Sequence, residues 1–458
     1  MKFGRDTTLK VEAEDALCRL SATAAIRKIQ EKEISALELA KSCVARINEI
    51  EDMVKAWAYF DEAKMLSHAN AVDEKINNDE PIGPLCGIPV GIKDVFNTKD
   101  MPTCMGSPIW EGFTPGNDAR VVTYIRWADG IIAGKTVTAE FAVHHPGPTV
   151  NPHNFAHSPG TSSSGSAAAV AAFMVPLALG TQTAGSTIRP ASYCGIYGFK
   201  PSFGLIPRIG ILKTLDTLDH VTFFSRAIND LYLMFEAIRA KGHNYPLISK
   251  FLEGQDGREK TKKNNEWKVA FVRTPAWNEA EGYAKEAILN YASSISKLKG
   301  LSLEEVDLPE GFNSVHDVHD LIYTKALSYY FKDEYDAQKE KISQIFREMV
   351  ENGRRISIED YSWGLERQRF FIHQLDEFFE KYDFILTLST AGEAPKGLYA
   401  RDKKDSCLIW TLCHAPAINL PVFKSPKGLP FGAQIVSRRY RDYDLLDFAK
   451  ILERGGKG

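Results

Sequence analysis

Residues 158–190 read SPGTSSSGSAAAVAAFMVPLALGTQTAGSTIRP, two serine-glycine segments on either side of an alanine-rich apolar run. The segments, 158–166 and 180–190, contain too many turn-forming residues to be core elements. Each adjoins an apolar stretch that would hold it rigid, and a loop of small residues lets several backbone N–H groups converge on one point. Taken alone, either segment is explained equally well as a tight turn between a strand and a helix.

The sequence around these segments alternates between two patterns from about residue 83 to about residue 230. Short apolar, β-branched runs at 88–92, 130–133 and 175–179 are separated by stretches with helical patterning at 119–128 and 163–173. This alternation predicts an α/β sheet. We therefore expect one large α/β domain over residues 1–458: a mixed, twisted β-sheet flanked by helices on both faces, with a helical insertion in the C-terminal half.

The composition is that of an ordinary globular protein. Of 458 residues, 56 are Lys or Arg and 59 are Asp or Glu, which gives a net charge of −3. Binding to nucleic acid or to an anionic membrane through excess positive charge is therefore not expected. Seven cysteines without a C-x-x-C pair argue against a disulfide framework and against a cysteine-rich metal site. The first residues lack the apolar segment of a signal peptide, and the run 167–179 is too short to span a bilayer, so we expect a cytoplasmic protein.

Three other motifs are weaker candidates for chemistry. Residues 130–136 resemble a phosphate-binding loop but are one residue too short for G-x-x-x-x-G-K-[ST]. His316 and His319 could share one helical face, yet no third metal ligand is near in the sequence, and a solvated helix is the better explanation. His144 and His145 precede a Pro-Gly-Pro loop and could line a pocket, but no partner acid is evident. No G-x-S-x-G pentapeptide is present, so a Ser-His-Asp triad on a nucleophile elbow is not supported.

A set of segments in a fixed order is more specific than any of these motifs. The segments are 87–94 (GIPVGIKD), 158–172, 180–202 (GTQTAGSTIRPASYCGIYGFKPS), 215–221 (LDTLDHV), 416–421 (PAINLP) and 428–434 (GLPFGAQ). Together they resemble the amidase signature family over nearly the whole chain, most densely between residues 83 and 230. The resemblance implies the amidase-signature fold, with a signature core at about 83–230 and the catalytic loops in a central cleft. The helical segment at about 312–381 is rich in aromatic residues, among them Tyr323, Tyr329, Tyr330 and Phe331. We therefore expect it to lie over that cleft as a lid and to help decide the substrate.

The resemblance implies a role for each of three side chains. Ser186 would be the nucleophile, Ser162 the bridging serine and Lys93 the base, and the two serines stand 24 residues apart, as they do in family members. The peptide bond between Thr161 and Ser162 would be cis. No metal or cofactor is implied. The oxyanion hole would be formed by four backbone N–H groups, those of Thr183, Ala184, Gly185 and Ser186.

The chemistry is consistent with this assignment. A serine hydroxyl is a weak nucleophile and requires a base within hydrogen-bond reach. A lysine can be that base only when it is neutral, which requires its pKa to fall by several units from about 10.4. Burial has this effect because it disfavours the charged ammonium. Lys93 directly follows the apolar run 88–92, which favours a buried side chain, and Ser162 would pass a proton from Ser186 to Lys93.

The sequence departs from the family pattern at several positions near these groups. Thr161 stands where a glycine usually precedes the bridging serine, Ala184 replaces a common glycine, and Thr222 replaces the glycine of a Val-Gly-Pro segment. The arginine that many members carry two places after the nucleophile comes one place later, at Arg189. We expect Arg189 and Gln182 to shape the nucleophile loop through hydrogen bonds. No catalytic group is lost, so the departures concern substrate preference and rate.

Three functions are compatible with the sequence. The first is a stand-alone amidohydrolase that cleaves the C–N bond of a small-molecule amide through a Ser186 acyl-enzyme. The second is the glutaminase subunit of a tRNA-dependent amidotransferase, although such subunits usually carry an aspartate at the position of Gln182 and a different continuation after Ser186. The third is a catalytically silent binding protein on the same fold. We favour the first function, with no nucleic-acid or membrane partner; a homodimer is compatible with the sequence.

Overall fold

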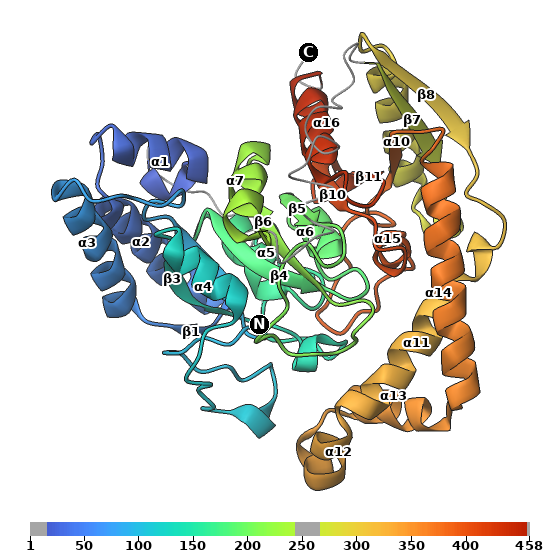
Figure 1. Ribbon diagram of the computed structural model, residues 1–458, viewed down its shortest axis with the longest axis horizontal. Helices are drawn as coiled ribbons and strands as arrows, with labels where there is room; N and C mark the ends of the chain where they lie inside the picture. Colours follow the sequence, from blue (N-terminus) through green and yellow to red (C-terminus); the bar gives the residue numbers. More distant parts are fainter. Residues whose placement is uncertain (1–15, 243–265, 456–458) are drawn as a thin grey trace, which may run out of the picture.

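The computed structural model describes residues 16–242 and 266–455 of the chain (Figure 1). Within them a mixed sheet of eleven strands has the order β1-β3-β2-β4-β6-β5-β10-β11-β9-β7-β8. The strands are β1 (Trp57–Phe60), β2 (Pro89–Lys93), β3 (Ile131–Thr136), β4 (Leu177–Gln182), β5 (Tyr197–Lys200), β6 (His220–Ser225), β7 (Trp267–Val272), β8 (Leu301–Val306), β9 (Phe384–Leu388), β10 (Ala417–Lys424) and β11 (Pro430–Ser437). The expected mixed α/β sheet is confirmed. The first residues, on which part of the cytoplasmic expectation rests, lie outside the described residues.

Strand direction changes along the sheet. β2 is parallel to both of its neighbours, β3 and β4, and β7 is parallel to β8 and β9. The strands between these two groups pair antiparallel. Parallel strands covered on both faces need apolar residues along their whole length, and every residue of β2, β3 and β4 is buried. The predicted runs 88–92, 130–133 and 175–179 overlap these three strands.

Helices cover both faces of the sheet, as expected. Phe199 of β5 lies edge-on to Phe235 of α7 (Ile228–Ile238), with 5.6 Å between the ring centroids. A Cβ added to the neighbouring Gly198 would instead meet Ala191 of α6 (Ile188–Tyr193). Because successive residues of a strand point to opposite faces, α6 and α7 lie on opposite faces of the sheet. α4 (Arg120–Trp127) and α16 (Asp442–Gly455) contact α7, whereas α5 (Ser164–Ala171) contacts α6.

The end of the first serine-glycine segment and the alanines that follow it form α5, whose residues 164–170 are all buried. A Cβ added to Gly165 would lie 2.4 Å from the carbonyl oxygen of Ala56 and 2.4 Å from the backbone nitrogen of Val137. Small residues are therefore required on this helix because neighbouring backbone approaches it closely. The remaining helices of the described N-terminal part and of the β7–β8 connection are α1 (Ala22–Gln30), α2 (Ala36–Val54), α3 (Glu62–Asn77) and α10 (Gly282–Ile295).

The predicted helical segment 312–381 contains α11 (Val315–Tyr330), α12 (Lys332–Gln338), α13 (Gln344–Arg355) and α14 (Ile358–Phe378). These helices lie along one side of the molecule (Figure 1). α11 is central among them, since it contacts α12, α13, α14 and α15 (Cys407–Leu412). The helical insertion in the C-terminal half is confirmed.

The structure agrees with the rejection of a phosphate-binding loop at residues 130–136. Gly134, Lys135 and Thr136 belong to β3 rather than to a loop, and the Lys135 ammonium pairs with Asp94 at 3.0 Å. The seven cysteines are free. Over residues 16–242 and 266–455, no helix combines the length and the apolar character needed to cross a membrane.

Candidate active site

Lys93 is the last residue of β2, and its side chain is completely buried. Its nitrogen Nζ lies 2.8 Å from the hydroxyl oxygen of Ser162 and 2.7 Å from that of Thr181. Burial lowers the pKa of Lys93 to about 7, and the negative charge of Asp219 opposes this shift. At neutral pH a large fraction of the molecules therefore carries an uncharged amine at this position, which can accept a proton.

The sheet topology explains why these groups meet. β2 and β4 are parallel neighbours, so Lys93 at the end of β2 and Thr181 near the end of β4 lie at the same edge of the sheet. Ser162 precedes α5, and α5 contacts both β2 and β4. A buried strand that ends in a lysine thus places an amine beside the segment of the predicted bridging serine.

Burial alone does not single out Lys93. Lys200 is also completely buried, and burial lowers its pKa to about 7, but its Nζ contacts backbone carbonyl oxygens. Burial also lowers the pKa of Lys135, which pairs with Asp94. Of these three lysines, only Lys93 contacts one of the predicted catalytic serines.

The segment of the bridging serine has the backbone that the family resemblance implies. The peptide bond between Thr161 and Ser162 is cis. Ser162 is buried, and its carbonyl oxygen accepts a hydrogen bond from the Ala139 N–H at 3.2 Å. The Thr161 hydroxyl donates to Asp402 at 3.4 Å. The threonine that replaces glycine here therefore supplies a contact to a loop far away in the sequence.

The predicted nucleophile lies on a turn that Gln182 shapes. Ser186 is half-buried between β4 and α6. The Gln182 Oε1 accepts hydrogen bonds from the backbone N–H groups of Thr187 at 2.9 Å and Ile188 at 3.0 Å. Its Nε2 donates to the Thr411 hydroxyl at 2.9 Å. An aspartate at this position could accept hydrogen bonds but could not donate one to Thr411.

The structure brings two of the three predicted catalytic side chains into contact. Lys93 contacts Ser162, whereas no hydrogen bond to the Ser186 hydroxyl is present among the described residues. The catalytic roles of the three side chains therefore remain predictions. Thr222, which replaces a glycine of the family pattern, contacts Thr187, the residue after the predicted nucleophile. The hydroxyl oxygens of the two threonines are 2.5 Å apart.

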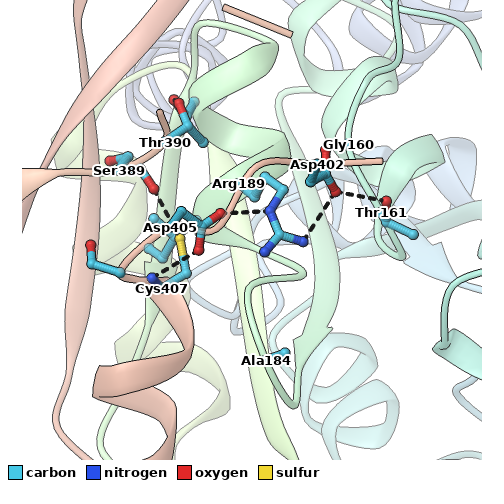
Figure 2. A network of polar contacts seen from close by, with 12 residues as sticks. Gly160, Thr161, Ala184, Arg189, Ser389, Thr390, Asp402, Asp405 and Cys407 are labelled. Atoms are coloured by element: carbon cyan, nitrogen blue, oxygen red, sulfur yellow. Dashed lines mark hydrogen bonds and ion pairs between the residues drawn. The ribbon is translucent and has the colours of Figure 1, made fainter. Parts of the chain in front are cut away.

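Arg189, in the first turn of α6, lies between two carboxylates of the loop before α15 (Figure 2). Its Nε is 2.6 Å from Asp405 and its Nη1 is 3.2 Å from Asp402. Because Asp402 also accepts from Thr161, it links the segment of the bridging serine to the helix that follows the nucleophile. Burial raises the pKa of Asp402, and Arg189 opposes that rise. Sequence reasoning missed both acids because Asp405 is 216 residues from Arg189 along the chain.

A third missed acid, Asp219, contacts the nucleophile turn. Asp219 is buried and accepts a hydrogen bond from the Thr183 hydroxyl at 2.6 Å. It also accepts from the backbone N–H groups of Thr214 and Leu215, both at 2.9 Å. Burial raises the pKa of Asp219, and these hydrogen bonds oppose the rise. The carboxylate belongs to the LDTLDHV segment, whose likeness to the family pattern is the signal that could have found it.

Two histidines of α11 reach the same region. His319 is buried, and its Nε2 lies 2.9 Å from the carbonyl oxygen of Thr183. His316, one turn earlier, lies 3.0 Å from the carbonyl oxygen of Asp405. The expectation of a solvated helix at this position is wrong, because this face of α11 packs against the nucleophile turn. In the parts of the chain that the structure describes, no group of three or more His, Cys, Asp or Glu is placed to hold a metal ion.

His144 lies beside α11. Its ring is 6.3 Å from that of Tyr323 and edge-on to it. The His144 side chain is exposed. A cavity of about 530 Å³ lies elsewhere, between the segments that follow β7 and β8, and none of the predicted catalytic residues lines it. The central cleft therefore remains a prediction.

Comparison with known proteins agrees with this fold. The Amidase family model matches residues 38–446. A glutamyl-tRNA(Gln) amidotransferase subunit of Streptomyces coelicolor is 31% identical over 480 residues, which cover 95% of this chain and 96% of that protein. The corresponding protein of Acidothermus cellulolyticus is 42% identical over 234 residues, which cover 50% of this chain and 46% of that protein. The chain belongs to the amidase family.

Solved structures extend the comparison to the fold. A crystal structure of an amidase superposes with a TM-score of 0.82 at 25% identity, covering 95% of this chain and 99% of that one. The native peptide amidase from Stenotrophomonas maltophilia superposes with a TM-score of 0.83 at 22% identity, covering 96% and 97% of the two chains. The family resemblance and the amidase-signature fold inferred from the sequence are confirmed, and with them a hydrolase that acts on C–N bonds.

Proposed function

We propose that this chain hydrolyses the C–N bond of a carboxamide with Ser186 as the nucleophile. The observation that carries the proposal is the 2.8 Å contact between Lys93 and Ser162, made where burial lowers the pKa of Lys93 to about 7. The neutral Lys93 takes a proton from Ser162, Ser162 takes one from Ser186, and the Ser186 oxygen attacks the amide carbonyl carbon.

The remaining steps use the same groups in reverse. The oxyanion of the tetrahedral intermediate faces the backbone N–H groups of residues 183–186, each worth about 3 kcal/mol in such sites. When the C–N bond breaks, Ser162 delivers a proton to the leaving nitrogen and recovers one from Lys93. Water gives a proton through Ser162 to Lys93 and attacks the ester carbonyl carbon. The C–O bond to Ser186 then breaks, the Ser186 oxygen recovers a proton through Ser162, and the carboxylate is released.

Two candidate functions are each favoured by a different observation. Gln182 favours a stand-alone amidohydrolase, because glutaminase subunits usually carry an aspartate at this position. An aspartate could not donate the hydrogen bond that Gln182 gives to Thr411. The amidotransferase subunits that resemble the chain over 95% of its length favour a glutaminase subunit that works with protein partners, and this broad likeness carries more weight. A primary carboxamide is the substrate class that the two candidate functions share, since glutamine itself carries one. We therefore propose a primary carboxamide as the substrate and ammonia as the leaving group.

We also propose that the segment 312–381 belongs to the same functional unit as the signature core and borders the substrate. The contact of His319 with Thr183 and the approach of Tyr323 to His144 support this placement. The other aromatic residues of α11 do not, since Tyr329 is exposed and Tyr330 bonds to Asp216.

The decisive experiment measures ammonia and amine release by the purified chain from aliphatic, aromatic and ureido amides and from glutamine. We expect Ser186→Ala to abolish turnover and Lys93→Ala to reduce it nearly as much, with unchanged circular dichroism. Ser294→Ala, a change on α10 remote from the site, is the control and should leave turnover unaltered. Turnover that survives Ser186→Ala would refute the proposal, and a folded chain with neither turnover nor fluorophosphonate labelling would favour the silent binding protein.

A further inference from the structure

Three consecutive carbonyl oxygens of the nucleophile turn, those of residues 183–185, each have a hydrogen-bond partner. The Thr183 carbonyl oxygen lies 2.9 Å from the Nε2 of His319. The Ala184 carbonyl oxygen accepts from the Thr411 hydroxyl at 2.8 Å. The Gly185 carbonyl oxygen accepts from the backbone N–H of Arg189 at 3.0 Å. Two of these three donors are side chains that come from outside the serine-glycine segments.

Holding a carbonyl oxygen also aims the next N–H group. In a trans peptide the C=O and the following N–H lie in one plane and point in opposite directions. The bond from His319 to Thr183 therefore fixes the direction of the Ala184 N–H, and the bond from Thr411 to Ala184 fixes that of the Gly185 N–H. Both N–H groups belong to the set expected to face the oxyanion.

The direction of the Thr411 hydroxyl is set by Gln182. The Gln182 Nε2 can only donate, so the Thr411 oxygen accepts at 2.9 Å and its own hydrogen is free for an acceptor. The Ala184 carbonyl oxygen, at 2.8 Å, is nearer than the alternative acceptor in α15, the Cys407 carbonyl oxygen at 3.3 Å. Gln182 thus orients Thr411 toward the turn.

The protonation of His319 is likewise fixed by its partner. A carbonyl oxygen only accepts, so the Nε2 of His319 carries the hydrogen. Burial lowers the pKa of this imidazole to about 4, so it is neutral at physiological pH and places no charge beside the nucleophile turn.

We propose that His319 and Thr411 are positioning residues of the oxyanion hole, which hold the Thr183 and Ala184 carbonyl oxygens so that the Ala184 and Gly185 N–H groups face the developing negative charge. This inference rests on the proposed function at Ser186. It gives α11 and α15, which lie far from the serine-glycine segments in sequence, an indirect part in stabilising the transition state, through the backbone N–H groups that they orient.

The test measures fluorophosphonate labelling of Ser186 in the full chain, because the phosphonyl oxygen occupies the oxyanion position and no knowledge of the natural substrate is needed. We expect His319→Leu and Thr411→Val to lower the maximal labelling rate by roughly 10–100-fold, since oxyanion donors act in the transition state. The concentration for half-maximal rate should change little. His319→Gln and Thr411→Ser keep a donor at these positions and should restore most of the rate.

Matched controls remove the same kind of bond elsewhere. His153→Leu removes an imidazole 2.9 Å from the Cys194 carbonyl oxygen, and Thr149→Val removes a hydroxyl that donates to the Lys55 carbonyl oxygen at 2.6 Å. Both should label at the wild-type rate, even if their melting temperatures fall as much as those of the test variants.

The outcomes separate this inference from the proposed function. If the wild type is labelled at Ser186 and His319→Leu and Thr411→Val are labelled equally fast, the positioning roles are overturned and the nucleophile stands. If His319→Gln and Thr411→Ser are as slow as His319→Leu and Thr411→Val, packing rather than donation matters, and the inference is again overturned. If Ser186→Ala labels like the wild type, the proposed function fails and the inference fails with it.

Discussion

Lys93 and Lys200 are buried to the same extent, but their side-chain nitrogens contact different groups. Both side chains are completely buried, and burial lowers the pKa of each to about 7. Lys93 contacts the hydroxyl groups of Ser162 and Thr181, which can give up a proton, whereas Lys200 contacts carbonyl oxygens, which cannot. At the scale of the residue, chemistry therefore depends on what the buried nitrogen contacts as well as on its pKa.

The pKa of Lys93 predicts a pH profile. Protonation of Lys93 below pH 7 removes the base, so kcat/KM should fall by about tenfold per pH unit below 7 and reach a plateau above it. The measurement is kcat/KM for a neutral amide from pH 5 to pH 9. Lys200→Met is the control, because it removes a lysine of similar pKa that lies away from the serines, and the midpoint should stay in place. A profile that is flat over this range would contradict the base assignment.

At the scale of the element, the close packing of α5 predicts a sharp contrast between two glycines. Gly165→Ala would place a methyl group 2.4 Å from backbone atoms of Ala56 and Val137, so we expect a loss of about 1–3 kcal/mol or more in the free energy of unfolding. Gly282→Ala, at the start of α10, meets nothing within 4 Å and should leave stability unchanged or raise it by up to about 1 kcal/mol. Urea unfolding of both variants checks this, and equal effects would refute the packing argument.

The loop before α15 predicts a second effect at this scale. Asp402→Ala removes a carboxylate that joins Arg189 to Thr161, so the free energy of unfolding should fall by about 1–3 kcal/mol. Asp333→Ala, on an exposed position of α12, is the control and should change it by less than about 0.5 kcal/mol. Thr161→Val should add little to Asp402→Ala because both remove the same link. Full additivity of the two changes would show that the link is absent in solution.

At the scale of the whole molecule, all the proposed catalytic groups come from one chain. A stand-alone amidohydrolase should therefore release ammonia from a primary carboxamide without a partner. If the chain is instead part of a glutaminase complex, a second protein should copurify and raise glutamine turnover by about tenfold or more, a coupling of ordinary size. Affinity purification with assays before and after removal of bound proteins distinguishes the two candidates. A chain that is active only in a complex would contradict the first expectation.

Part of the fold was open to prediction because it depends on local patterns. The largely apolar runs 88–92, 130–133 and 175–179 overlap β2, β3 and β4, because parallel strands buried on both faces require such runs. β5 and β6 were missed, since Tyr197–Lys200 is short and His220–Ser225 mixes polar and apolar residues while being wholly buried. The pair His316 and His319 was misjudged because the partners of both imidazoles are backbone carbonyl oxygens, which leave no signal in the sequence.

The sequence by itself determined the family, the α/β sheet and the identity of the lysine and serine that meet, because order and spacing of small residues and apolar runs are local properties. Only the tertiary structure decided that burial leaves Lys93 with a pKa of about 7 beside Ser162. It alone placed Asp402 and Asp405 on Arg189, and His319 and Thr411 on the nucleophile turn. The physical reason is that the properties of these groups depend on desolvation and on contacts between segments distant in sequence. Both arise only when the chain folds.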